Sequence, residues 1–183
     1  MVVVGMLRGV NLGPHKRIKM SDLKELCLSL DLECPQTYVQ SGNILFKTQS
    51  RNLVRLAASI ETAIERKFGF HSDVILRSSA ELHEVVAKNP FASRKGIEPN
   101  KLLVTFLATD PGEEALTKLR QIKAEPEELW INGRELFIYF PNGMARPKLS
   151  IPLLERTLKT SGTGRNWNTV TKLLELAEAM ERT

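Results

Sequence analysis

Thr-Tyr-Val-Gln-Ser-Gly-Asn-Ile-Leu-Phe-Lys, residues 37–47, decides the fold because it places a short polar turn between two segments that favour strands. The pattern predicts strands at 37–40 and 44–47, joined by a tight hairpin at Ser41-Gly42-Asn43. Directly afterwards, over 52–68, apolar residues recur at the spacing of one helix face. The stretch therefore predicts two antiparallel strands followed by a long amphipathic helix.

The flanking segments extend this core in both directions. An apolar strand is predicted at 2–8, a helix over 21–30 and a further strand at 73–77. Together with the hairpin and its helix, they give the order β-α-β-β-α-β, which is the ferredoxin-like arrangement. We expect residues 1–78 to form a first ferredoxin-like subdomain.

The same order returns after a bridging helix and linker at 79–100. The predicted elements of the second half are a strand at 102–107, a helix at 113–123, strands at 129–131 and 135–140 joined at Asn132-Gly133, a helix at 150–159 and a short strand near 163–165. The sequence predicts an α+β protein of two tandem ferredoxin-like (α/β plait) subdomains, with antiparallel sheets that carry helices on one face. The second subdomain is expected at 101–183 and includes the C-terminal helix.

Several predicted strands are apolar on both faces, notably 2–7, 102–107 and 136–140. Antiparallel strands with one solvated face alternate apolar and polar residues, so these strands are expected to be covered on both sides. Helices would cover one face. The second face would be covered either by the other subdomain of the same chain or by a second copy of the protein. Both a monomer and a homodimer therefore remain possible.

Composition limits the class of protein. The chain has 183 residues, is 42% hydrophobic, and carries 26 Lys and Arg against 21 Asp and Glu, a net charge of +5. This charge suits anionic partners but is too low for a dedicated nucleic-acid arm. No segment reaches the ~18 apolar residues of a membrane span, so we expect a cytoplasmic protein without a membrane partner.

The sequence contains no recognisable motif for catalysis or for binding a cofactor. Cys27 and Cys34 lack the spacing of a redox motif or a zinc site, and we interpret them as ordinary thiols. No metal-ligand pattern occurs, so neither a metal nor a cofactor is expected. His15, His71 and His83 stand near no recognisable nucleophile motif, so no catalytic residue is assigned.

Short phrases spread along the chain carry a family resemblance. They are Leu7-Arg8-Gly9-Val10-Asn11, Thr37-Tyr38-Val39-Gln40-Ser41-Gly42-Asn43, Asn89-Pro90-Phe91, Lys148-Leu149-Ser150 and Arg165-Asn166-Trp167-Asn168-Thr169-Val170. With them the chain closely resembles the bacterial family called domain of unknown function 1697. The resemblance implies an α+β protein of two plait-like subdomains and assigns no activity.

Polar residues gather where predicted strands end and predicted helices begin, which is where functional loops lie. The candidate ligand-binding residues are Arg8, Asn11, Lys19, Gln40, Asn43, Lys148, Ser150, Arg165, Asn166, Asn168 and Lys172. They predict a protein that binds, or binds and acts on, a small anionic or nucleotide-like ligand at a cleft between the subdomains. Asparagines also cap helices and form turns, so a purely structural or interaction protein would use the same residues.

Nucleic-acid binding is the other alternative, and a plait sheet would need exposed aromatic rings for it. Phe46 is the aromatic residue of the first sheet, while Phe137 and Tyr139 share one face of the second. Packing of these rings under a covered face is favoured over base stacking. The last helix, capped by Asn166 or Asn168, is expected to bury one apolar stripe.

Overall fold

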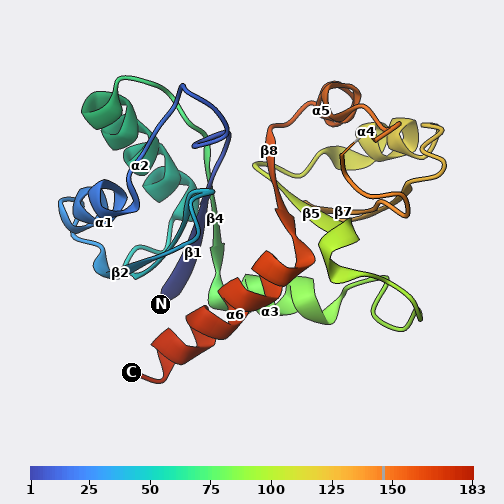
Figure 1. The fold of residues 1–183 in the computed structure, drawn as a ribbon. Helices are drawn as coiled ribbons and strands as arrows, with labels where there is room; N and C mark the ends of the chain where they lie inside the picture. The colour runs from blue at the N-terminus through green and yellow to red at the C-terminus, as the bar shows by residue number, and fades with distance from the viewer. Residues whose placement is uncertain (146) are drawn as a thin grey trace. The chain divides into compact units, whose positions relative to one another are not determined.

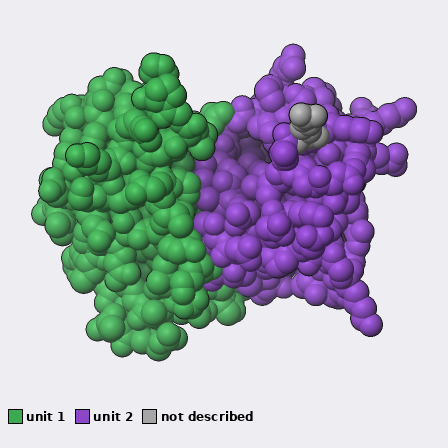
Figure 2. Space-filling view, viewed as in Figure 1, with its two compact units in different colours: residues 1–84, 172–183 green, residues 85–171 purple. Residues whose placement is uncertain are grey.

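The computed structural model describes residues 1–145 and 147–183, which form two compact units. The first unit holds residues 1–84 and 172–183, and the second holds residues 85–171 (Figures 1 and 2). Each unit contains a four-stranded sheet in which every neighbouring pair of strands is antiparallel. The predicted α+β class is confirmed.

The first unit follows the predicted element order. Its elements are β1 (Val2–Leu7), α1 (Met20–Leu28), β2 (Glu33–Tyr38), β3 (Asn43–Lys47), α2 (Leu53–Phe68), β4 (Val74–Ser78), the start of α3 (Ser79–Ala87) and, from the end of the chain, most of α6 (Trp167–Glu181). The sheet order is β2-β3-β1-β4, so β1 lies inside the sheet and β2 at an edge.

The second unit repeats this order. Its elements are η1 (Pro99–Lys101), β5 (Leu102–Leu107), α4 (Gly112–Leu119), β6 (Glu128–Asn132), β7 (Glu135–Tyr139), α5 (Ile151–Leu158), β8 (Gly162–Asn166) and the start of α6 (Trp167–Glu181). The sheet order β6-β7-β5-β8 matches that of the first unit strand by strand. Among the described helices, none combines the length and the apolar character needed to span a bilayer.

Burial on both faces is confirmed for β1, where all six residues are buried. Val3 and Leu7 join a core with Leu23 of α1 and Ile60 of α2, so these helices pack on one face of the sheet. Successive side chains of a strand point to opposite faces of the sheet, so Val4 points to the face opposite Val3 and Leu7. Val4 is also completely buried. The strand is apolar throughout because neither of its faces meets water.

The first hairpin is longer than predicted. β2 ends at Tyr38 and pairs there with Asn43, so the turn consists of residues 39–42. Gly42 has a φ of 75°, and a Cβ on it would lie 2.5 Å from Cγ2 of Val10, so this position requires glycine. β2 also begins at Glu33, before the predicted start, because it is an edge strand with polar, largely exposed residues and no apolar periodicity.

In each unit the fourth strand runs directly into a helix that its last residue caps. Ser78 ends β4, and its Oγ accepts a hydrogen bond of 3.2 Å from the backbone N–H of Glu81. Asn166 ends β8, and its Oδ1 accepts one of 2.9 Å from the N–H of Thr169. Of the two predicted caps for the last helix, Asn166 is therefore the one the structure uses.

The two thiols differ sharply in environment. Cys27 is buried and Cys34 is exposed, and burial raises the pKa of the Cys27 thiol to about 12. We predict that a thiol reagent at about pH 8 labels one thiol per native chain and two after unfolding. Cys34→Ser should leave the native chain unlabelled, and rapid labelling of that variant would contradict the assignment. Because the folded pKa exceeds the unfolded one, stability from the buried neutral thiol should fall as pH rises from about 9 towards about 12.

Candidate functional site

The segment between β1 and α1 is a strongly cationic loop, here called the basic loop and defined as residues 8–19. It contains Arg8, Lys16, Arg17 and Lys19 and no carboxylate. Lys16, Arg17 and Lys19 are exposed. Figure 1 shows the loop as the blue trace that follows β1, at the end of the sheet away from the N-terminus. The loop therefore presents several cations to solvent from one short segment.

Asn11 holds this loop in place. Its side-chain Nδ2 donates to the carbonyl oxygens of Ile18, at 2.9 Å, and Gln40, at 2.8 Å, while its Oδ1 accepts from the N–H of Ile18 at 3.0 Å. The backbone N–H of Asn11 donates to the carbonyl of Lys16 at 3.0 Å. Its φ of 57° lies in the left-handed region that asparagine tolerates better than most residues. Asn11 thus fixes the loop internally and to the β2–β3 turn.

Arg8 anchors the beginning of the loop to the segment before β4. Its Nη1 lies 3.2 Å from Oδ2 of Asp73, and His71 Nε2 lies 3.0 Å from the other oxygen. Burial alone would raise the pKa of Asp73, but the hydrogen bonds and charges of His71 and Arg8 lower it below its ordinary value. Lys16 Nζ also donates to the carbonyl of His71 at 3.1 Å. One edge of the first unit is therefore built from the basic loop, the 39–42 turn and residues 71–73.

The two candidates of the first hairpin, Gln40 and Asn43, differ in exposure. Asn43 is completely buried, and its Nδ2 donates to the carbonyl of Tyr38 and to Oγ of Ser41, both at 3.0 Å. Gln40 is exposed, and its carbonyl accepts the bond from Asn11. Asn43 closes the turn, whereas the Gln40 side chain is accessible to a ligand.

Most candidates of the last third of the chain have structural contacts. Oγ of Ser150 accepts from the N–H of Leu153 at 3.4 Å and caps α5. The backbone N–H of Lys148 donates to Oε1 of Glu127 at 3.1 Å, although Lys148 itself is exposed. Lys172 Nζ, in the first unit, lies 2.7 Å from Glu175.

Arg165 is the most buried of the charged candidates, with 7% of its surface exposed. Its Nη1 donates to Oγ1 of Thr163 and to the carbonyl of Gly164, both at 2.8 Å. Burial lowers the pKa of its guanidinium to about 10. Asn166 next to it caps α6, and Asn168 is exposed. The cluster predicted before the last helix thus combines a buried arginine, a cap and one accessible amide.

The aromatic residues considered for base stacking are buried. Phe46 and Phe137 are completely buried, and Tyr139 is 6% exposed. The Phe137 ring packs 6.5 Å from that of Trp167. These rings pack in the interior, as the sequence favoured, and do not offer a stacking platform. In the part of the chain that the structure describes, no group of three or more His, Cys, Asp or Glu is placed to hold a metal ion.

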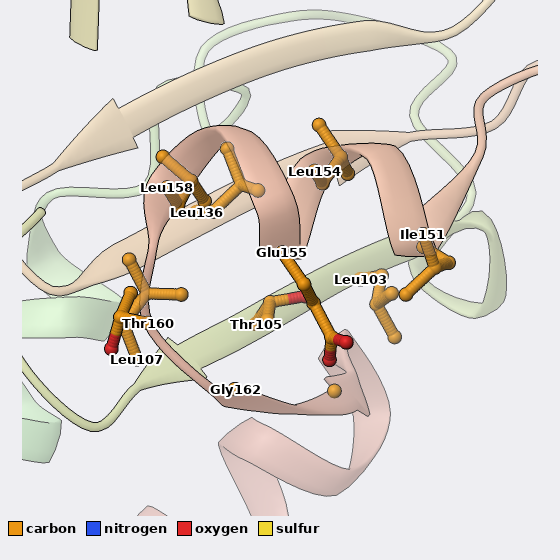
Figure 3. A pocket seen from close by; sticks show the side chains of 11 residues that line it. Leu103, Thr105, Leu107, Leu136, Ile151, Leu154, Glu155, Leu158, Thr160 and Gly162 are labelled. Atoms are coloured by element: carbon orange, nitrogen blue, oxygen red, sulfur yellow. The ribbon is translucent and has the colours of Figure 1, made fainter. Parts of the chain in front are cut away.

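The second unit also contains a pocket that was not predicted from the sequence, shown in Figure 3. Gly162 and Gly164 of β8 contribute to its wall. Two glycines two positions apart leave one face of a strand without side chains, and this spacing was the available signal.

Comparisons with known proteins agree with this architecture. The conserved bacterial protein SP0830 from Streptococcus pneumoniae has a similar solved structure, with a TM-score of 0.70 and 19% sequence identity over 96% of this chain and 98% of that one. At this identity the likeness shows the fold alone. No curated protein matches the chain. The family model described as "Protein of unknown function (DUF1697)" matches residues 1–137, about three quarters of the chain, and the protein therefore belongs to this family.

Proposed function

We propose that the protein binds, or binds and acts on, a small anionic or nucleotide-like ligand, and that the basic loop is its main contact. One observation carries the proposal: Asn11 holds in a fixed shape a loop that exposes Lys16, Arg17 and Lys19 and contains no carboxylate. The carboxylate of Asp73 contacts this edge, and it already interacts with the side chains of Arg8 and His71. The remaining charge of the loop favours an anion.

The fixed shape of the basic loop matters because ordering a flexible loop on binding costs conformational entropy and lowers the affinity for the ligand. The three side-chain bonds of Asn11 set the loop conformation before a ligand arrives, which reduces that cost. A hydrogen bond between a cation and an oxyanion contributes roughly 1.5–3 kcal/mol. Two such bonds are enough for a ligand such as a phosphate ester to bind measurably.

We also infer that both units are ferredoxin-like modules. The inference is supported by their shared β-α-β-β-α-β order and by matching sheet orders. The sequence-based limits of 1–78, 79–100 and 101–183 stay predictions. So does the expectation that Arg8 shares one ligand with Arg165 and the other candidates of the last third of the chain.

The test is a thermal-shift screen with pyrophosphate, ATP, a phosphosugar and a short oligonucleotide. A ligand at about 100 times its dissociation constant should stabilise the protein by about 2.7 kcal/mol, or roughly 5–10 °C in melting temperature. Arg17→Glu should remove this shift. Arg51→Glu is the matched control, because Arg51 is also exposed but follows β3 at the other end of the sheet, so its shift should persist.

The screen also separates the alternatives. A small-anion site predicts shifts with pyrophosphate or ATP that reach saturation. A nucleic-acid module would respond to the oligonucleotide alone, with an affinity that falls steeply with salt as counterions are released. That result, or equal loss of the shift in the Arg17 and Arg51 variants, would refute the proposal.

A further inference from the structure

We propose that the second unit holds a separate binding site for a small, uncharged, apolar molecule about the size of two fused rings. The site is the pocket between α5 and the sheet, here called the α5 pocket, with a volume of about 230 Å³. Leu103 and Leu107 of β5 and Leu136 of β7 line it from the sheet, and Leu154 and Leu158 line it from α5 (Figure 3). This site is distinct from the basic loop, which belongs to the first unit.

Glycines open the sheet side of this pocket. In β8, Gly162 pairs with Leu107 and Gly164 pairs with Thr105. A Cβ on Gly162 would lie 2.8 Å from Cγ2 of Thr105, and one on Gly164 would lie 3.1 Å from Cδ1 of Leu103. A side chain at Gly162 would therefore collide with Thr105, and one at Gly164 would require Leu103 to shift by a few tenths of an ångström. At these two positions β8 therefore contributes backbone and no side chain to the wall, and Thr105 and Leu103 lie close over it.

The first unit shows the same fold with this space filled. At the equivalent register, Val74 of β4 pairs with Leu7, and Leu76 pairs with Gly5. Both Val74 and Leu76 are buried in the core that α2 covers. The covering helix also differs, since α2 has 16 residues and α5 has 8. The pocket therefore does not follow from the topology alone. It comes from the glycines and the short helix of the second unit.

The walls determine which molecule fits. The leucines offer no hydrogen bonds, so a polar group of a ligand that faces them would lose its water without compensation. Thr105 supplies a hydroxyl group, and Figure 3 shows Glu155 extending from α5 beside it. The leucine walls give no charge-assisted contact to an anion, so the ligand class proposed for the basic loop does not suit this pocket. A cavity of about 150 Å³ binds benzene, so 230 Å³ suits a two-ring molecule.

Indole is a suitable probe because it is uncharged and has two fused rings. We expect saturable binding to the full chain by isothermal titration calorimetry, with a dissociation constant below about 1 mM. Ile151 lines the pocket at its helix side and is 41% exposed. Ile151→Trp should obstruct the pocket and weaken indole binding by about tenfold or more, because the larger side chain takes up space that the ligand needs.

Leu153→Trp is the matched control, because Leu153 lies on the same helix, is 38% exposed and does not line the pocket. Its indole affinity should stay within about twofold of the unmodified protein. Gly164→Leu, which copies Leu76 of the first unit, should abolish binding, and Ile151→Trp decides the matter if this variant does not fold. Arg17→Glu should leave indole binding unchanged, so failure here is separate from failure at the basic loop. No saturable binding, or equal loss in both tryptophan variants, would overturn the proposal.

Discussion

Asn11→Ala is expected to lower the free energy of unfolding of the first unit by about 2–4 kcal/mol. The change removes three side-chain hydrogen bonds, each contributing about 1 kcal/mol, and places alanine at a left-handed φ of 57° at a further cost of roughly 1 kcal/mol. Urea denaturation followed by fluorescence or circular dichroism measures the loss. Because the loop also loses its fixed shape, the stabilisation by an anionic ligand should decrease in the same variant.

Two further variants separate the loss of the side-chain hydrogen bonds from the cost of the left-handed backbone conformation. Asn11→Gly tolerates the positive φ but lacks the side chain, so it should lose about 1 kcal/mol less than Asn11→Ala. Asn11→Asp keeps an acceptor for the N–H of Ile18 but loses both donated bonds. It should therefore fall between the unmodified protein and Asn11→Ala. If Asn11→Gly proves as stable as the unmodified protein, the hydrogen bonds do not hold the loop and this account of Asn11 is wrong.

Arg165→Ala is expected to lower the free energy of unfolding by about 2–4 kcal/mol as well. The substitution removes the donor that serves Thr163 and the carbonyl of Gly164 in a buried setting, and it leaves a cavity. Chemical denaturation of the variant gives the loss directly. Lys148→Ala, at an exposed candidate, should change stability by less than about 0.5 kcal/mol and serves as the comparison.

Arg165→Met distinguishes lost packing from lost charge. Methionine fills much of the same space without a charge, so it restores packing but not the hydrogen bonds of the guanidinium. Because burial lowers the pKa of Arg165 to about 10, its charge is held at a cost. The Met variant should therefore be more stable than the Ala variant. Equal and large losses in both would show that the guanidinium contacts dominate.

Arg165 was predicted from sequence as a ligand contact, and its burial changes how such a variant must be interpreted. A weaker thermal shift in Arg165→Ala would follow from destabilisation alone. Variants at the exposed cations of the basic loop do not share this problem, because Arg17 and Lys19 contribute no described hydrogen bond from their side chains to another element. They are the informative positions for ligand binding.

Much of the fold was predictable because its strongest signals are local. The largely apolar sequence of β5 and the helical spacing of α2 identify those elements within a residue or so. Edge strands carry no such pattern, since their side chains are partly in water, and β2 was placed too late for this reason. The β2–β3 turn was predicted at 41–43 but consists of residues 39–42, and the close approach of Gly42 to Val10, far away in sequence, is not shown by any local pattern.

The candidate site stays a prediction, and the sequence did not indicate which structural contacts its residues make. The structure brings the basic loop, the 39–42 turn and residues 71–73 together. Whether an asparagine binds a ligand or a backbone carbonyl depends on partners far away in sequence. Asn11 meets Gln40 across 29 residues, and no local pattern indicates that bond. The α5 pocket was missed because it depends on glycines that are recognised only through strand register.

The most direct measurement is a titration of the ¹⁵N-labelled protein with pyrophosphate, followed by backbone amide chemical shifts. Binding at the basic loop predicts shifts that saturate and concentrate in residues 8–19, 40–42 and 71–73, and that weaken strongly in Arg17→Glu but not in Arg51→Glu. Shifts that do not saturate up to about 10 mM, where even a millimolar site would be filled, would contradict the proposed function. Saturating shifts that leave residues 8–19 unperturbed would contradict the proposed site.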